Sequence, residues 1–163
     1  MDNQEFINVE DIINIARKAG KEILKIYKED YDIMDKEDNL SIGKVISPLT
    51  LADLKSNEII SKKLKELYPK IPLISEENKE IPFKTRKEWE YFWLIDPLDG
   101  TKEFINKNGE FTINIALVKK NKPVFGLIYV PVKDVFYFTK NKKAYKQKGE
   151  DPPIKIGYSK ENG

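Results

Sequence analysis

Chemistry in this chain would centre on carboxylates that directly follow apolar segments. In the run that starts at Tyr91, five large apolar residues lead into Asp96, Pro97, Leu98, Asp99, Gly100 and Thr101. The apolar half predicts a strand buried on both faces, which would bring Asp96 to the edge of the core. A carboxylate there is costly unless a cation neutralises it, and carboxylate oxygens are good Mg²⁺ ligands.

The end of this run could also bind an anion. Gly100 allows backbone N–H groups to approach a ligand closely, and Thr101 can begin a short helix through Phe104. The free N–H groups and the dipole at such a helix start favour phosphate. A cation site beside an anion site is typical of metal-assisted phosphoryl chemistry. The alternative is an ordinary turn, because Asp, Pro and Gly are all common turn residues.

Two other segments repeat the transition from apolar to acidic residues. A short predicted strand over Pro72–Ser75 ends in Glu76 and Glu77, which could also be a plain exposed pair. A predicted helix carries Asp53 in its first turn, where the spacing Thr50-x-x-Asp53 alone favours a capping box. Three such transitions in one small chain are nevertheless economically explained by one shared cation.

The composition narrows the chemistry further. Among the 163 residues there is no cysteine and no histidine. Thiolate nucleophiles, zinc–sulfur sites and mechanisms that rely on a histidine base are therefore excluded. Catalysis by these residues would depend on carboxylates, hydroxyl groups, lysines and a metal ion.

The hydrophobic content and the net charge are those of a globular protein. Hydrophobic residues make up 40% of the chain, and the formal net charge of +2 is too small to indicate a nucleic-acid partner. No apolar run is long enough to cross a membrane, and the acidic first residues lack the layout of a signal peptide. We therefore expect a cytoplasmic protein.

Two amphipathic helices are predicted to position the acidic segments. Asn8 can cap a helix that runs to about Asp30, and a second helix begins near Thr50 and continues to Leu67. Residues 31–44 predict a strand or loop, and residues 79–90 predict a charged connector.

Strands dominate the second half of the chain. Short polar turns separate three apolar runs and predict an antiparallel meander over Phe111–Val118, Pro123–Val130 and Val135–Thr139. Ala144 and Tyr145 can add a last short strand, and the tail that follows carries no strong pattern. The expected fold class is layered α+β, with two N-terminal helices packed on a largely antiparallel β-sheet.

Taken together, the acidic segments resemble the signature of the inositol-monophosphatase superfamily of Mg²⁺-dependent, lithium-sensitive phosphatases. Asp96–Thr101 matches its Asp-Pro-x-Asp-Gly-Thr motif, and Ser75–Glu77 matches its upstream acidic motif. Thr50 and Asp53 match its third element. The resemblance implies the sugar-phosphatase-like αβαβα layers, of which this chain would be the N-terminal part.

Within the superfamily, two longer strings resemble one branch. Lys102–Ile105 and Asn108–Leu117 are similar to the CysQ branch, the 3′(2′),5′-bisphosphate nucleotidases of sulfur metabolism. The implied reaction is hydrolysis of adenosine 3′,5′-bisphosphate to AMP and phosphate, incomplete in this chain alone. Inositol monophosphatase or another sugar phosphatase would use the same chemistry, although Lys102–Phe104 argues against it. An inactive, truncated remnant that binds metal or phosphate is the third alternative.

The resemblance also implies a role for each site residue. Two or three Mg²⁺ ions, with inhibition by Li⁺, would be held by Glu76, Asp96, Asp99 and the backbone carbonyl of Leu98. Asp53 and Thr101 would orient or deprotonate the attacking water, with Glu76 helping through its metal. The substrate phosphate would bind at Leu98, Asp99, Gly100 and Thr101, the last two through their backbone amides. The capping interpretation of Asp53 then gives way to a catalytic one.

One part of the family pattern does not occur in this sequence. The family's second half has a Trp-Asp motif whose carboxylate completes the metal site, whereas here Trp89 precedes Glu90 and Trp93 precedes Leu94. We expect residues 1–149 to form an N-terminal metal-binding domain and residues 150–163 a tail or the start of a further domain. An apolar face left uncovered would favour self-association or a separate chain that supplies the C-terminal half. The resemblance leaves peripheral association with the inner membrane open.

Overall fold

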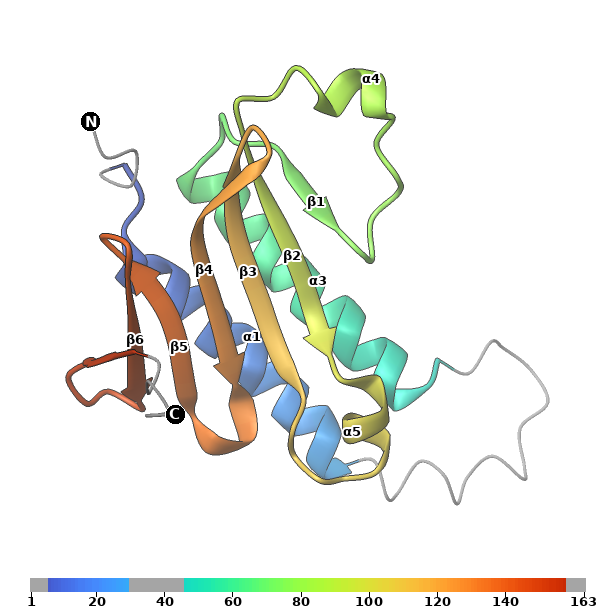
Figure 1. Cartoon of the computed structure of the whole chain (residues 1–163). Helices are drawn as coiled ribbons and strands as arrows, with labels where there is room; N and C mark the ends of the chain where they lie inside the picture. Colours follow the sequence, from blue (N-terminus) through green and yellow to red (C-terminus); the bar gives the residue numbers. More distant parts are fainter. Residues whose placement is uncertain (1–5, 30–45, 158–163) are drawn as a thin grey trace, which may run out of the picture.

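The protein forms a sheet that is covered by helices on one face (Figure 1). The computed structural model describes residues 6–29 and 46–157. Helices α1 (Val9–Glu29) and α3 (Pro48–Leu67) lie against each other and against that face. The expected layered α+β class is therefore confirmed. The strand or loop predicted over residues 31–44 lies outside the described residues, and no described helix is long and apolar enough to cross a membrane.

Helix α1 follows the sequence prediction closely. The Asn8 side chain accepts a hydrogen bond from the backbone N–H of Glu10 at 3.1 Å, which caps the first turn. An apolar stripe at helical spacing faces the sheet, and Ile12, Ala16, Ala19 and Ile23 are fully buried. Most of the stabilisation of this helix therefore comes from burial of that stripe.

Helix α3 begins earlier than predicted. Its cap is Ser47, whose Oγ accepts from the backbone N–H of Thr50 at 3.1 Å, and Pro48 occupies the first turn. The helix expected from near Thr50 to Leu67 is confirmed with a start at Pro48, whereas the Thr50–Asp53 capping box is wrong because Ser47 is the cap. Pro48 does not delay the helix, because a first-turn residue needs no N–H donor and the fixed φ of proline suits this position.

The sheet contains seven strands in sequence order, so each strand neighbours the next along the chain. Strand β1 (Leu73–Ser75) runs parallel to β2 (Tyr91–Asp99). The remaining neighbours are all antiparallel, which confirms the meander, and they are β3 (Thr112–Lys119), β4 (Lys122–Val130), β5 (Val135–Lys140), β6 (Lys143–Lys148) and β7 (Ile154–Ile156). The strand expected at Ala144 and Tyr145 is confirmed as part of β6, and the tail from Lys146, which was expected to carry no strong pattern, contains the second half of β6 and all of β7.

Two connections also contain short helices. The connector between β1 and β2, predicted only as a charged segment, includes α4 (Phe83–Arg86). A 3₁₀ turn, η1 (Pro131–Lys133), joins β4 to β5. Strand β2 is followed directly by α5 (Thr101–Ile105), the short helix expected after Gly100.

Burial on β2 alternates, so the expectation that both faces are covered is wrong. Trp93 and Ile95 point toward the helices and are fully buried, whereas Leu94 between them is 45% exposed. The same face continues across the sheet with Ile128 at 47% and Tyr137 at 37% exposure. Helices α1 and α3 cover one side of the sheet, and none of the described helices covers the other side (Figure 1).

Candidate metal-binding site

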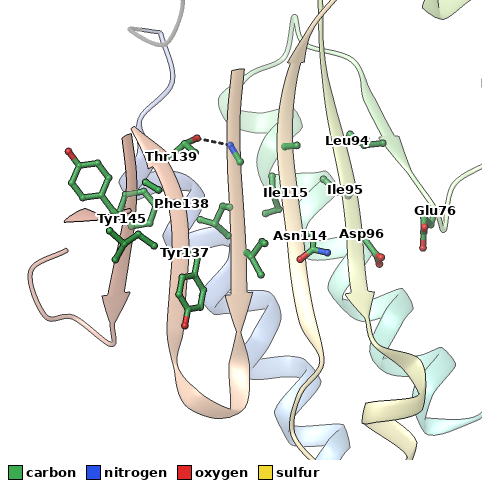
Figure 2. Close-up of a pocket in the computed structure, with 16 residues that line it drawn as sticks. Glu76, Leu94, Ile95, Asp96, Asn114, Ile115, Tyr137, Phe138, Thr139 and Tyr145 are labelled. Atoms are coloured by element: carbon green, nitrogen blue, oxygen red, sulfur yellow. Dashed lines mark hydrogen bonds between the residues drawn. The ribbon is translucent and has the colours of Figure 1, made fainter. Parts of the chain in front are cut away.

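Glu76 and Asp96 meet because β1 and β2 run parallel. Ser75 pairs with Ile95, so Glu76, the first residue after β1, lies beside Asp96 of β2. Figure 2 shows both carboxylates at one end of the uncovered face, close to Asn114. Two of the three acidic segments are thereby brought together by one strand pairing.

Helix α3 delivers the third carboxylate, Asp53, to the same place. The Ser56 hydroxyl donates to the backbone oxygen of Pro97 at 2.7 Å, which fastens this part of α3 to the end of β2. Burial, a hydrogen bond with Glu77 and the charges of Glu77, Asp96 and Glu76 raise the pKa of Asp53 to about 7. Its Oδ1 is buried and has no hydrogen-bond partner among the described residues.

Asp96 has a similar environment. Burial, followed by the negative charges of Glu76 and Asp99, raises the pKa of Asp96 to about 6. The backbone N–H of Leu98 donates to Asp96 Oδ1 at 3.3 Å and offsets part of this rise. An irregularity in the pairing between Asp96 and Asp99 changes the direction of β2 just after the carboxylate.

Asp99 is oriented by a chain of hydrogen bonds from β3. Asn114 Nδ2 donates to Asp99 Oδ2 at 3.1 Å, and the Thr112 hydroxyl donates to Asn114 Oδ1 at 3.0 Å. Sequence analysis assigned no role to Asn114. The signal was a polar residue alternating with Ile113 and Ile115 within an apolar strand, which places it on the face opposite the core.

The turn that carries Glu76 and Glu77 is held against α3 by a second polar chain. Ser75 Oγ donates to Asn57 Oδ1 at 2.6 Å, and Asn57 Nδ2 donates to Asn78 Oδ1 at 3.1 Å. The backbone N–H of Glu77 donates to Ser75 Oγ at 3.3 Å. Asn57 was also missed, although it lies one helical turn after Asp53 and therefore on the same face of α3.

The segment expected to bind phosphate has the predicted local shape. Gly100 has φ of +89°, a conformation that side chains rarely adopt, and it immediately precedes α5. A Cβ atom at Gly100 would lie 3.2 Å from the Cα of Phe111 and 3.1 Å from Glu103 Oε2. Leu98 is buried and Thr101 is exposed at the start of the helix. The roles of Leu98, Asp99, Gly100 and Thr101 toward phosphate stay predictions.

The residues present suit a hard divalent cation. The donors at this edge are carboxylate oxygens, and burial together with neighbouring negative charges raises the pKa values of Asp53 and Asp96. Among the described residues, however, no three acidic side chains converge closely enough to form a complete metal site by themselves. Mutual repulsion favours separated carboxylates, and a cation between them would draw them together.

Comparison with known proteins agrees with this geometry. The sequence profile of the inositol monophosphatase family matches residues 2–162. The 3′(2′),5′-bisphosphate nucleotidase CysQ of Shigella flexneri is 41% identical over 141 residues, covering 85% of this chain and 54% of the relative. The protein of the same name from Haemophilus influenzae is 40% identical over 136 residues, covering 83% and 47%.

Solved structures give the same result. The crystal structure of CysQ from Bacteroides thetaiotaomicron, a bacterial member of the inositol monophosphatase family, superposes with a TM-score of 0.73 at 44% identity, covering 90% of this chain and 52% of that one. The suhB protein of Bartonella henselae superposes with a TM-score of 0.65 at 28% identity, covering 84% and 50%. The chain therefore spans about half the length of the relatives it matches.

Proposed function

Because this chain belongs to the inositol monophosphatase family, we propose that it carries the catalytic carboxylates of a Mg²⁺-dependent phosphomonoesterase. We propose as its reaction the hydrolysis of adenosine 3′,5′-bisphosphate to AMP and phosphate. The names of the relatives at about 41% identity support this substrate. The observation that carries the proposal is that β1, β2 and α3 bring Glu76, Asp96 and Asp53 to the same edge of the sheet, through the pairing of Ser75 with Ile95 and the contact of Ser56 with Pro97.

The role that we propose for each residue follows from its surroundings. Glu76, Asp96, Asp99 and the carbonyl of Leu98 would hold Mg²⁺, which when bound lowers the pKa of water and offsets charge on the phosphoryl oxygens. Asp53 is suited to accept a proton from the attacking water, because a base with a pKa near 7 is effective at neutral pH. The Thr101 hydroxyl would orient that water, and the N–H groups of Gly100 and Thr101 would hold the phosphate.

Two alternatives fit the same carboxylates. Inositol monophosphate or another sugar phosphate would need the same metal and water chemistry. A binding remnant without turnover would keep metal affinity and lose hydrolysis. Inhibition by Li⁺, a place in sulfur metabolism and cytoplasmic location stay predictions.

The test combines metal binding with a substrate panel. Mg²⁺ binding is measured by calorimetry on the wild type, on Asp96→Asn and on Asp151→Asn, an exposed carboxylate in a different part of the chain. Phosphate release is then followed for adenosine 3′,5′-bisphosphate, AMP and inositol 1-phosphate. Binding that is lost only in Asp96→Asn supports the site, and turnover of the bisphosphate above the other esters supports the substrate. Equal binding in all three proteins would refute the proposed metal site.

A further inference from the structure

The short helix α5 packs on a cluster of three aromatic rings that joins it to α1. Tyr27 of α1, Phe104 of α5 and Phe111 all contact one another, with ring centres 5.0 to 5.2 Å apart in each pair. Phe104 and Phe111 are fully buried, and α5 lies beside the C-terminal end of α1 (Figure 1). The start of α5 contacts the same cluster, because a Cβ atom at Gly100 would lie 3.2 Å from the Cα of Phe111.

Lys107, which follows α5, binds the last turn of α1. Its ammonium donates a hydrogen bond to the backbone carbonyl of Tyr27. The same ammonium lies 4.2 Å from the centre of the Tyr27 ring and 5.5 Å from that of the Phe104 ring. Carbonyls in the last turn of a helix lack partners within the helix, and the helix dipole favours a cation there. Lys107 therefore joins the two helices through one hydrogen bond and two cation–π contacts.

The backbone at Lys107 has an unusual conformation. Its φ of +58° lies in the left-handed region, which residues with a side chain rarely adopt. Its N–H donates to the carbonyl of Phe104 at 3.3 Å, so this conformation ends the last turn of α5. A strained backbone persists only where the surrounding contacts determine it. A glycine would adopt this conformation without strain, but it would lack the ammonium that binds Tyr27.

Backbone hydrogen bonds within α5 link Lys107 to the turn at Gly100. The N–H of Phe104 donates to the carbonyl of Gly100 at 3.0 Å, and the N–H of Asn106 donates to the carbonyl of Lys102 at 2.8 Å. Because these bonds close consecutive turns, α5 moves as one unit. A contact that holds its C-terminal end therefore also limits motion at its N-terminal end.

We propose that Lys107 is a positioning residue for phosphate binding, which holds α5 against α1 and thereby fixes the N–H groups of Gly100 and Thr101. Donors that are already in place lose less conformational entropy when the anion binds, so their affinity for it is higher. This inference rests on the phosphate role proposed for Gly100 and Thr101. Asp96 and Glu76 are placed by the pairing of β1 with β2, so their affinity for Mg²⁺ should depend much less on Lys107.

Calorimetry with inorganic phosphate in the presence of Mg²⁺ gives the first test. Lys107→Met keeps the unbranched apolar stem and removes the ammonium, so it should lower phosphate affinity by about tenfold. Lys107→Arg keeps a donor and a cation and should retain most of the affinity. Lys120→Met is the matched control, because Lys120 is an exposed lysine with φ of +55° in the β3–β4 turn, and it should have no effect. Mg²⁺ binding without phosphate should be nearly the same in all four proteins.

Hydrogen exchange followed by NMR distinguishes a local contact from a general loss of stability. In Lys107→Met, the N–H groups of Phe104 and Asn106 should exchange about tenfold faster than in the wild type, whereas those of β3 should be unchanged. Lys107→Arg should restore the slower exchange in α5.

Three results would contradict this inference in different ways. Unchanged phosphate affinity in Lys107→Met would overturn the role of Lys107 and leave the proposed function standing. Faster exchange throughout the chain would also overturn it, because the lysine would then stabilise the whole fold rather than position α5. A wild type that binds Mg²⁺ but no phosphate would refute the anion site of the proposed function itself, and the positioning role with it.

Discussion

Glu76 and Asp96 lie side by side because Ser75 and Ile95, the residues before them, are paired in the one parallel ladder of the described sheet. The other neighbouring strands are antiparallel, so adjacent strands end at opposite edges. The parallel pair places the carboxyl-terminal end of β1 beside Asp96 of β2, and α3 adds Asp53 to these two carboxylates. The acidic site is therefore a consequence of the long crossover between β1 and β2.

The pH dependence of stability should report the repulsion at this site. The folded pKa of Asp53, about 7, and that of Asp96, about 6, both exceed the ordinary value of 3.8. At pH values between the ordinary pKa of 3.8 and these raised pKa values, the folded state binds more protons than the unfolded state. Their contribution to the free energy of unfolding is therefore complete below about pH 4 and is lost as the pH rises through 6 to 7. Partial exposure of both groups reduces the size of the effect.

Urea denaturation in EDTA at pH 5 and pH 7.5 measures this effect. Asp53→Asn should differ less from the wild type at pH 5 than at pH 7.5, where it should have the higher midpoint urea concentration, because the amide carries no charge to desolvate. Asp151→Asn, at an exposed position, should change neither value. A wild type that is more stable at pH 7.5 than at pH 5, with Asp53→Asn following the same trend, would contradict the prediction.

Asn114 should matter for cation binding more than for folding. Asn114→Ala removes the donor to Asp99 Oδ2 and leaves that carboxylate without its orienting partner. We expect a fall in Mg²⁺ affinity of about 10- to 100-fold, as is typical for residues that orient metal ligands. The accompanying loss of stability should be about 1 kcal/mol. Calorimetric titration should show no change for Asn121→Ala, an exposed asparagine in the β3–β4 turn, and equal affinities for both variants would exclude an orienting role.

Residue periodicity was enough to predict most of the fold. Helical spacing located α1, and period-two alternation with polar turns located β3, β4 and β5. The same signal failed on β2, where five consecutive apolar residues from Tyr91 indicated burial on both faces, although the helices cover one face only. A run of apolar residues shows that a face can be buried. It does not say which element buries it, and that depends on contacts distant in sequence.

The motifs located the carboxylates, and the polar residues that support them were found only in the structure. Asn57 and Asn114 act through hydrogen bonds to Ser75 and Asp99, residues 18 and 15 positions away. No local pattern carries that information. The cap of α3 could not be predicted from the sequence either, although its residues are close together in the chain. Both Ser47 and Thr50 could cap the helix, and only the backbone geometry distinguishes them.

The cap of α3 gives a simple stability prediction. Ser47→Ala removes the oxygen that accepts the Thr50 N–H and should cost about 1 kcal/mol of unfolding free energy. Thr50→Ala removes only the contact between the two hydroxyls, at 2.8 Å, and should cost clearly less. Thermal unfolding of the two variants distinguishes the positions. A larger loss in Thr50→Ala would restore the capping box that the sequence spacing suggested.

Gly100 should be intolerant of any side chain, for reasons of backbone conformation and space together. At φ of +89° an L-residue is strained, and a methyl group would also press on the backbone of Phe111 at 3.2 Å. We expect Gly100→Ala to lower the free energy of unfolding by about 1–3 kcal/mol. Gly126→Ala is the matched control, because no heavy atom lies within 4 Å of its added Cβ, and its stability should be close to that of the wild type.

Since Gly100 joins β2 to α5, relief of the strain would move the carbonyl of Leu98 and the N–H of Thr101. Gly100→Ala should therefore also weaken inorganic phosphate binding in the presence of Mg²⁺, as calorimetry can measure. Full stability together with unchanged phosphate affinity would show that this turn is not the constrained anion site we infer.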